Sequence, residues 1–155
     1  NFRGNENDLE VGCGGGNMSR FLSENLENGK LYCVDVSDFW ISKLERRLKN
    51  KKNISTFCGE VKDFGIDVRF DLAVFHFVLH DLSDDERMQT VGAVSERLKE
   101  GGLVYVREPI AESHGMPSEE IRKIFSYCGF VEVESHEDHS FPARDRFFDG
   151  VFQKR

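Results

Sequence analysis

Short apolar runs alternate along the chain with segments of helical period. Five runs rich in β-branched and aromatic residues lie at positions 9–11, 31–36, 54–57, 70–75 and 103–106. Between the first three runs, apolar residues recur every three or four positions, as on one face of an amphipathic helix. These two faces are formed by Met18, Phe21, Leu22 and Leu26, and by Ile41, Leu44 and Leu48. Strands that alternate with helices are typical of βαβ units, which build a parallel sheet.

Helix signals continue in the second half of the chain. Ser83 and Glu86 have the spacing of a capping box, so we expect a helix to begin there. We expect it to stop at Gly101 and Gly102, because glycine commonly stands just past a helix end. A last helix is expected over about 118–128.

The alternation changes after this helix. Residues 130–135 and 146–153 have the pattern of two strands with no helix between them. Two strands joined without a crossover run antiparallel if they pair, so we expect one reversed strand in an otherwise parallel, doubly wound α/β sheet. The length of 155 residues fits a single domain spanning 1–155.

Charge and composition narrow the class of protein. The formal net charge is −7, and the basic residues gather in one short segment, so no broad basic face is expected for a nucleic acid. No apolar run has the length of a membrane helix, and the polar N-terminus carries no secretory signal, so we expect a cytoplasmic protein. The cysteines match no redox or zinc spacing and are interpreted as small buried residues: Cys13, Cys33, Cys58 and Cys128.

A glycine-rich turn follows the first apolar run. Gly12, Gly14 and Gly16 stand between this strand and a helix, where glycines allow a sharp turn and free amides attract an electron-rich group. Asp35 ends the second strand, 19 residues after Gly16, where an acid can accept hydrogen bonds from ribose hydroxyls. The combination predicts a nucleoside site. Asn17 stands where the dinucleotide pattern GxGxxG requires its third glycine, which disfavours NAD.

With Glu10 before the glycines, this motif resembles that of the class I S-adenosylmethionine-dependent methyltransferases. The resemblance continues in order through Asp35, the segments 58–61 and 70–82, and the turns at 98–103 and 128–130. It is strongest for the small-molecule branch that includes quinone-biosynthesis methyltransferases. It implies the strand order 3-2-1-4-5-7-6 and S-adenosylmethionine as cofactor. The cofactor-binding residues it implies are Glu10, Gly12, Cys13, Gly14, Asp35, Val36, Gly59, Glu60, Val61 and Phe75.

The reaction needs alignment of acceptor, methyl group and sulfur more than it needs a base, because the sulfonium methyl is already electrophilic. His80, after the fourth strand, is the preferred base, although it could equally be a polar residue that caps its loop. Glu108, at the end of the fifth strand, points toward the same sheet edge but is interpreted as a solvated carboxylate, and His114 as a pocket wall or a plain loop residue. His136 and His139 lack further ligands, so no metal is expected.

We therefore expect methyl transfer to a small-molecule acceptor near residues 75–80 and 108–116, with neither nucleic acid nor membrane as partner. Relatives carry an N-terminal lid, which the eight residues before Leu9 do not supply. Two alternatives stay open: an NAD-dependent oxidoreductase, and a catalytically silent cofactor-binding regulatory domain.

Overall fold

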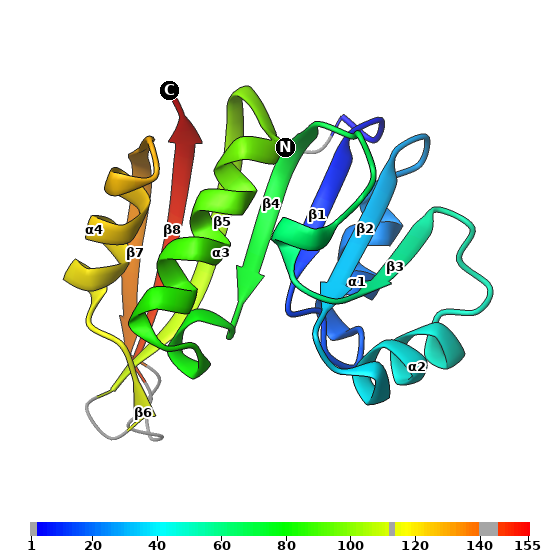
Figure 1. Cartoon of the computed structure of the whole chain (residues 1–155), viewed down its shortest axis with the longest axis horizontal. Helices are drawn as coiled ribbons and strands as arrows, with labels where there is room; N and C mark the ends of the chain where they lie inside the picture. The colour runs from blue at the N-terminus through cyan, green and yellow to red at the C-terminus, as the bar shows by residue number, and fades with distance from the viewer. Residues whose placement is uncertain (1–2, 112–113, 140–145) are drawn as a thin grey trace.

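A computed structural model describes residues 3–111, 114–139 and 146–155. Seven strands form a sheet in the order β3-β2-β1-β4-β5-β8-β7 (Figure 1). The first five strands pair in parallel, and β8 runs antiparallel to both β5 and β7. The strands are β1 (Asn7–Val11), β2 (Lys30–Asp35), β3 (Ile54–Cys58), β4 (Phe70–His76), β5 (Leu98–Ala111), β7 (Phe130–His139) and β8 (Arg146–Lys154). The predicted order 3-2-1-4-5-7-6 is thus confirmed; an additional two-residue strand, β6 (His114–Gly115), pairs with β5.

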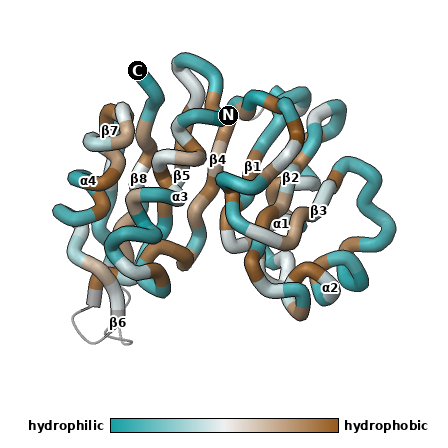
Figure 2. Tube along the Cα trace, viewed as in Figure 1, coloured by the Kyte–Doolittle hydropathy of each residue, from teal (hydrophilic) through white to brown (hydrophobic). Residues whose placement is uncertain are grey.

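Helices cover the two faces of this sheet. Helices α3 (Asp84–Arg97) and α4 (Ser118–Tyr127) lie in front of it in Figure 1, and α1 (Asn17–Asn25) and α2 (Asp38–Arg47) lie behind. The side chains of β1 alternate between the faces: Leu9 and Val11 belong to the front core, whereas Glu10 points to α1. Figure 2 shows hydrophobic stretches on the inner strands and also within the helices, for example α2 and α4. Two short helical turns, η1 (Val61–Asp63) and η2 (Leu79–Asp81), follow β3 and β4.

The end of α3 differs from the prediction. The capping box at its start is confirmed, since the Ser83 amide donates to Glu86 Oε2 at 2.8 Å. The helix nevertheless ends at Arg97, because the buried Leu98 already pairs with Phe70 in the sheet. The glycines that follow lie at an irregularity of β5: Gly101 has φ +71°, and the pairing register between β4 and β5 shifts beside it.

Two side-chain expectations also need correction. Phe21, counted on the apolar face of its helix, is 55% exposed, because that part of the helix projects over a hollow of the rear face. Cys13 and Cys33 are buried as expected, but Cys58 is exposed at the end of an outer strand and Cys128 is half-buried. All four thiols are free.

Candidate functional site

The glycine turn after β1 depends on left-handed backbone. Gly12, Gly14 and Gly16 have φ values of +66°, +49° and +80°. The Gly12 amide donates to the Val34 carbonyl at 2.8 Å, which fixes the turn against the end of β2. A Cβ at Gly12 would also lie 2.6 Å from Val78 Cγ2, so a side chain there meets both strain and a clash. The turn therefore keeps backbone at its surface, as close approach of a ligand requires.

Asp35 braces this turn from the end of β2. Its Oδ2 accepts a hydrogen bond from the Gly14 amide at 2.9 Å, and its Oδ1 accepts one from the Ser37 amide at 2.9 Å. A carboxylate has about four acceptor positions, so lone pairs remain for a ligand hydroxyl. The same side chain thus orders the turn and the start of α2, and it keeps capacity for a sugar.

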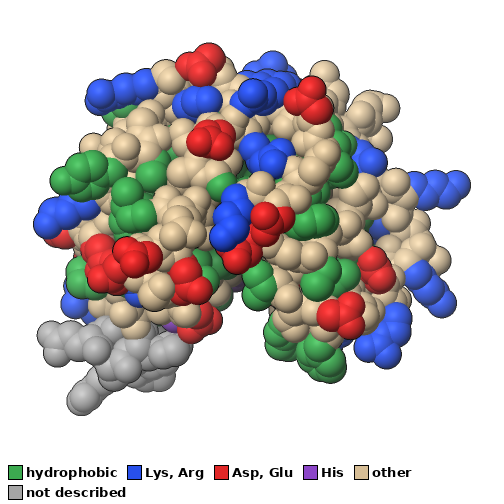
Figure 3. All heavy atoms as spheres, in the orientation of Figure 1, with side chains coloured by type: hydrophobic (Ala, Val, Ile, Leu, Met, Phe, Trp, Pro, Cys, Tyr) green, Lys and Arg blue, Asp and Glu red, His purple; other side chains and the backbone are tan. Residues whose placement is uncertain are grey.

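A cleft of about 170 Å³ lies beside the turn, at the sheet edge where parallel strands present their carboxyl ends. Figure 3 shows the lower edge of the molecule notched between its two halves. The cleft is walled by the ends of β1 and β2, the segment after β3, the loop after β4 and the first turns of α3. Its lining residues are Val11, Gly12, Val34, Asp35, Val36, Gly59, Glu60, Val61, Val78, Leu82, Glu86 and Thr90.

Most of the residues predicted to bind a cofactor meet at this cleft. Six of them line it: Gly12, Asp35, Val36, Gly59, Glu60 and Val61. Gly14 adjoins it through its hydrogen bond to Asp35. The side chains of Cys13 and Phe75 do not line it; Cys13 is buried in the rear core, and the Phe75 ring packs edge-on against Phe125.

Glu10, the remaining predicted residue, faces the rear of the sheet. Its buried carboxylate accepts hydrogen bonds from the Ser19 hydroxyl and, at 3.5 Å, from the Cys33 thiol. Burial raises the pKa of Glu10 to about 7, against the lowering effect of these donors. Its side chain ties α1 to β1 and β2, and so holds the helix that follows the glycine turn.

Six lining residues were not among the predicted cofactor-binding residues: Val11, Val34, Val78, Leu82, Glu86 and Thr90. The last three are spaced four residues apart, so a single face of α3 and the residue before its cap turn to the cleft. This spacing was available in the sequence, but it carries no sign of which face meets the sheet edge.

Glu108 is not the solvated carboxylate that we expected. It is fully buried at the carboxyl end of β5, and its carboxylate accepts from the backbone of the loop after β4 and from His80 Nδ1 at 2.7 Å. The His80 side chain is itself only 7% exposed. The structure therefore brings the candidate base and a buried acid together beside the cleft wall. The His114 side chain lies outside the described residues.

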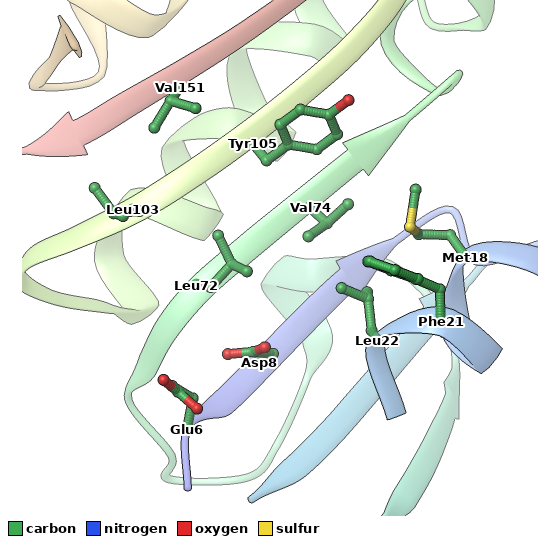
Figure 4. Close-up of a pocket in the computed structure, with 10 residues that line it drawn as sticks. All are labelled: Glu6, Asp8, Met18, Phe21, Leu22, Leu72, Val74, Leu103, Tyr105 and Val151. Carbon is green, nitrogen blue, oxygen red and sulfur yellow. The ribbon is translucent and has the colours of Figure 1, made fainter. Parts of the chain in front are cut away.

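A larger cavity of about 370 Å³ opens on the rear face of the sheet (Figure 4). Its walls are apolar side chains of α1, β4 and β5, including Phe21, Leu72 and Tyr105. Asp8 and Glu6 lie at one end. No glycine turn borders this cavity, so its lining lacks the features that favour a nucleotide.

Across residues 3–111, 114–139 and 146–155, no three His, Cys, Asp or Glu side chains gather as a metal site would require. No helix within those same ranges is long and apolar enough to cross a bilayer.

Comparisons with known proteins place this arrangement in context. A family model described as a methyltransferase domain matches residues 9–104. The chain is 27% identical over 66 residues to a malonyl-[acyl-carrier protein] O-methyltransferase of Priestia megaterium, covering 43% of this chain and 24% of that protein. It is 29% identical over 108 residues to the human tRNA N(3)-cytidine methyltransferase METTL2B, covering 64% and 29%. The chain thus spans about a quarter of the length of these curated relatives.

A solved structure shares the fold over nearly the whole chain. The N-methyltransferase NodS from Bradyrhizobium japonicum, solved in complex with S-adenosylhomocysteine, superimposes with a TM-score of 0.81 at 22% identity. The match covers 97% of this chain and 79% of NodS.

Proposed function

The chain belongs to the methyltransferase domain family, and from that premise we propose that it transfers a methyl group from S-adenosylmethionine to a small-molecule acceptor. The observation that carries the proposal is the glycine turn braced by Asp35 at the wall of the cleft. The residues fit the cofactor, since a Cβ at Gly12 would fill the space above the turn and Asp35 retains acceptor positions. Bound there, the cofactor supplies an electrophilic methyl group.

We assign the cleft residues to parts of the cofactor by their chemistry. Asp35 accepts from the ribose hydroxyls. Val36, whose side chain is 72% exposed, packs on the adenine ring. Glu60 accepts from the adenine amino group; its carboxylate, paired with Lys62 at 2.8 Å and about half exposed, is free to turn toward the cleft. The Val61 amide meets a ring nitrogen.

The remaining predicted residues support the site without lining it. Glu10 anchors α1 behind the glycine turn, and Cys13 contributes backbone to the turn. Phe75, the last residue but one of β4, pairs with Val11, and it contributes through its backbone position. His80 stays our candidate base for the acceptor, on the loop between β4 and α3.

A nucleic-acid acceptor is the second candidate, because one similar protein is a tRNA methyltransferase. The exposed face of α2 carries Phe39, Trp40 and Lys43, a combination that can stack on bases. The net charge of −7 favours the small molecule. Assays with unmodified tRNA and with small phenols, amines and carboxylic acids separate the two; efficient transfer to tRNA alone would overturn the small-molecule proposal.

The cheapest test of the cofactor is thermal unfolding with three ligands. At a hundredfold excess over its dissociation constant, a ligand that binds only the folded chain adds about 2.7 kcal/mol of stability. For a chain of this size we expect the melting temperature to rise by about 5–10 °C with S-adenosylmethionine or S-adenosylhomocysteine. NAD is the control. Stabilisation by NAD alone would replace this proposal with the oxidoreductase alternative.

We further propose that residues 1–155 act as one cofactor-binding domain and that the protein works in the cytoplasm. A silent regulatory domain would bind S-adenosylhomocysteine yet transfer no methyl group to any acceptor tested, which separates that alternative from an enzyme.

A further inference from the structure

Glu108 gathers four hydrogen-bond donors from a single loop. Its Oε1 accepts from the Val78 amide at 2.8 Å and the Leu79 amide at 2.7 Å. Its Oε2 accepts from His80 Nδ1 at 2.7 Å and, more weakly, from the His80 amide at 3.4 Å. A carboxylate buried to 0% exposure needs such partners, and here all of them come from residues 78–80.

The loop that Glu108 holds is conformationally demanding. Phe77, its first residue, has φ +60°, a left-handed conformation rare for a large side chain. From the other side, Arg87 Nε of α3 donates to the Leu79 carbonyl at 2.8 Å. Such a backbone persists only where its surroundings determine it strongly. The acid of β5 and the arginine of α3 clamp the loop between them.

Side chains of the clamped loop, residues 77–81, and of Leu82 just after it form one wall of the cofactor cleft. Val78 and Leu82 line the cleft, and Val78 Cγ2 stands directly above Gly12, where an added Cβ would come within 2.6 Å. A shift of the Val78 backbone therefore changes the space over the glycine turn. Glu108 does not line the cleft itself, so its influence passes through the loop.

The same carboxylate determines the state of the His80 ring. An ionised Glu108 can only accept, and the hydrogen of this 2.7 Å contact then stands on Nδ1. Nε2 is the other ring nitrogen; it lies 3.4 Å from Asp81 Oδ1, whose side chain is 70% exposed. Fixing one nitrogen of a histidine by a carboxylate sets its tautomer and orientation.

We infer that Glu108 is a positioning residue with two effects. Through the Val78 and Leu79 amides it holds the wall of the cofactor cleft in place, and through Nδ1 it sets the tautomer of His80. The effect on the cleft wall, which is the cleft half of the inference, rests on the proposed function. The effect on the His80 tautomer, which is its histidine half, rests on geometry alone. It links the cofactor side of the site to the candidate base through one side chain.

The first test measures S-adenosylhomocysteine affinity by calorimetry in Glu108→Gln. The amide offers one oxygen and adds donors that oppose the loop amides, so we expect affinity to fall about tenfold, which corresponds to about 1.4 kcal/mol. Glu134→Gln, at an exposed position of β7, is the matched control and should bind as the wild type does. Unchanged affinity in Glu108→Gln overturns the cleft half.

The second test observes the His80 ring by nitrogen-15 NMR of histidine-labelled protein without ligand. In the wild type we expect hydrogen on Nδ1, and in Glu108→Gln the loss of that preference; a retained tautomer overturns the histidine half. If Glu108→Gln does not fold, Glu108→Asp replaces it, because its carboxylate is one methylene too short to reach all four donors. A wild-type chain that binds no S-adenosylhomocysteine refutes the proposed function, whereas this spectrum still tests Glu108.

Discussion

An Asp35→Ala protein is expected to bind S-adenosylhomocysteine at least about 100-fold more weakly than the wild type, a loss of about 2.7 kcal/mol. Two effects add. The ligand loses the acceptor for its hydroxyl groups, and hydrogen bonds to a charged partner contribute about 1.5–3 kcal/mol each. The Gly14 and Ser37 amides also lose their acceptor, so the glycine turn and the start of α2 become less ordered. Calorimetric titration measures the change.

The matched control for Asp35→Ala is Asp38→Ala, which removes an exposed carboxylate from the first turn of α2, three residues away. It should bind within about threefold of the wild type, because a single exposed charge there contributes about 0.3–1 kcal/mol to the helix. Circular dichroism should show both variants folded. An Asp35→Ala protein that binds as tightly as Asp38→Ala would remove Asp35 from the site.

Asp8→Asn is expected to stabilise the folded chain by up to about 4 kcal/mol at pH 8.5. Both carboxylate oxygens of Asp8 are buried without a hydrogen-bond partner at one end of the rear cavity (Figure 4). Burial, together with the charges of Glu6 and Asp71, raises the pKa of Asp8 to about 7. A raised carboxyl pKa means that folding disfavours the ionised form, so the wild type loses stability as pH rises from about 4 to above 7.

Urea unfolding at pH 4 and at pH 8.5 measures this effect. The difference between wild type and Asp8→Asn should be small at pH 4, because Asp8 is protonated in the folded chain there and still about half protonated in the unfolded chain, and it should grow with pH. The pKa of Glu10 is also raised to about 7, so Glu10 adds the same pH dependence to the free energy of unfolding of both proteins. Its contribution therefore cancels in the comparison. Asp67→Asn, an exposed control, should follow the wild type. A pH-independent difference would contradict the assignment to Asp8.

Most of this fold is predictable from the sequence because the apolar residues have the spacing typical of the strand or helix that they form. The β-branched runs became β1 to β5, and the direct link between the last two runs required one reversed strand. The glycine turn and Asp35 were predictable because each needs a particular residue type at a particular strand end. The chain brings them within 2.9 Å of each other across 21 positions.

The burial of Glu108 was not predictable in the same way. The sequence analysis places Glu108 correctly near the end of β5. Its partners, however, include backbone amides about 30 positions earlier, and because nearly every residue has such an amide, residue types do not reveal which ones it meets. The end of α3 was missed for a related reason. The buried pairing of Leu98 with Phe70, a contact between distant segments, decided the boundary against the local glycine signal.

The strand order also has a consequence for the making of the protein. In the part of the chain that the structure describes, β7 joins the sheet only through β8, which a ribosome produces later. Until residues 146–154 emerge, β7 has no strand partner and the edge of β5 that pairs with β8 stays open, so both present unpaired backbone to other chains. Completion of the sheet therefore waits for residues 146–154, and in the interval before they emerge the nascent chain is more exposed to aggregation.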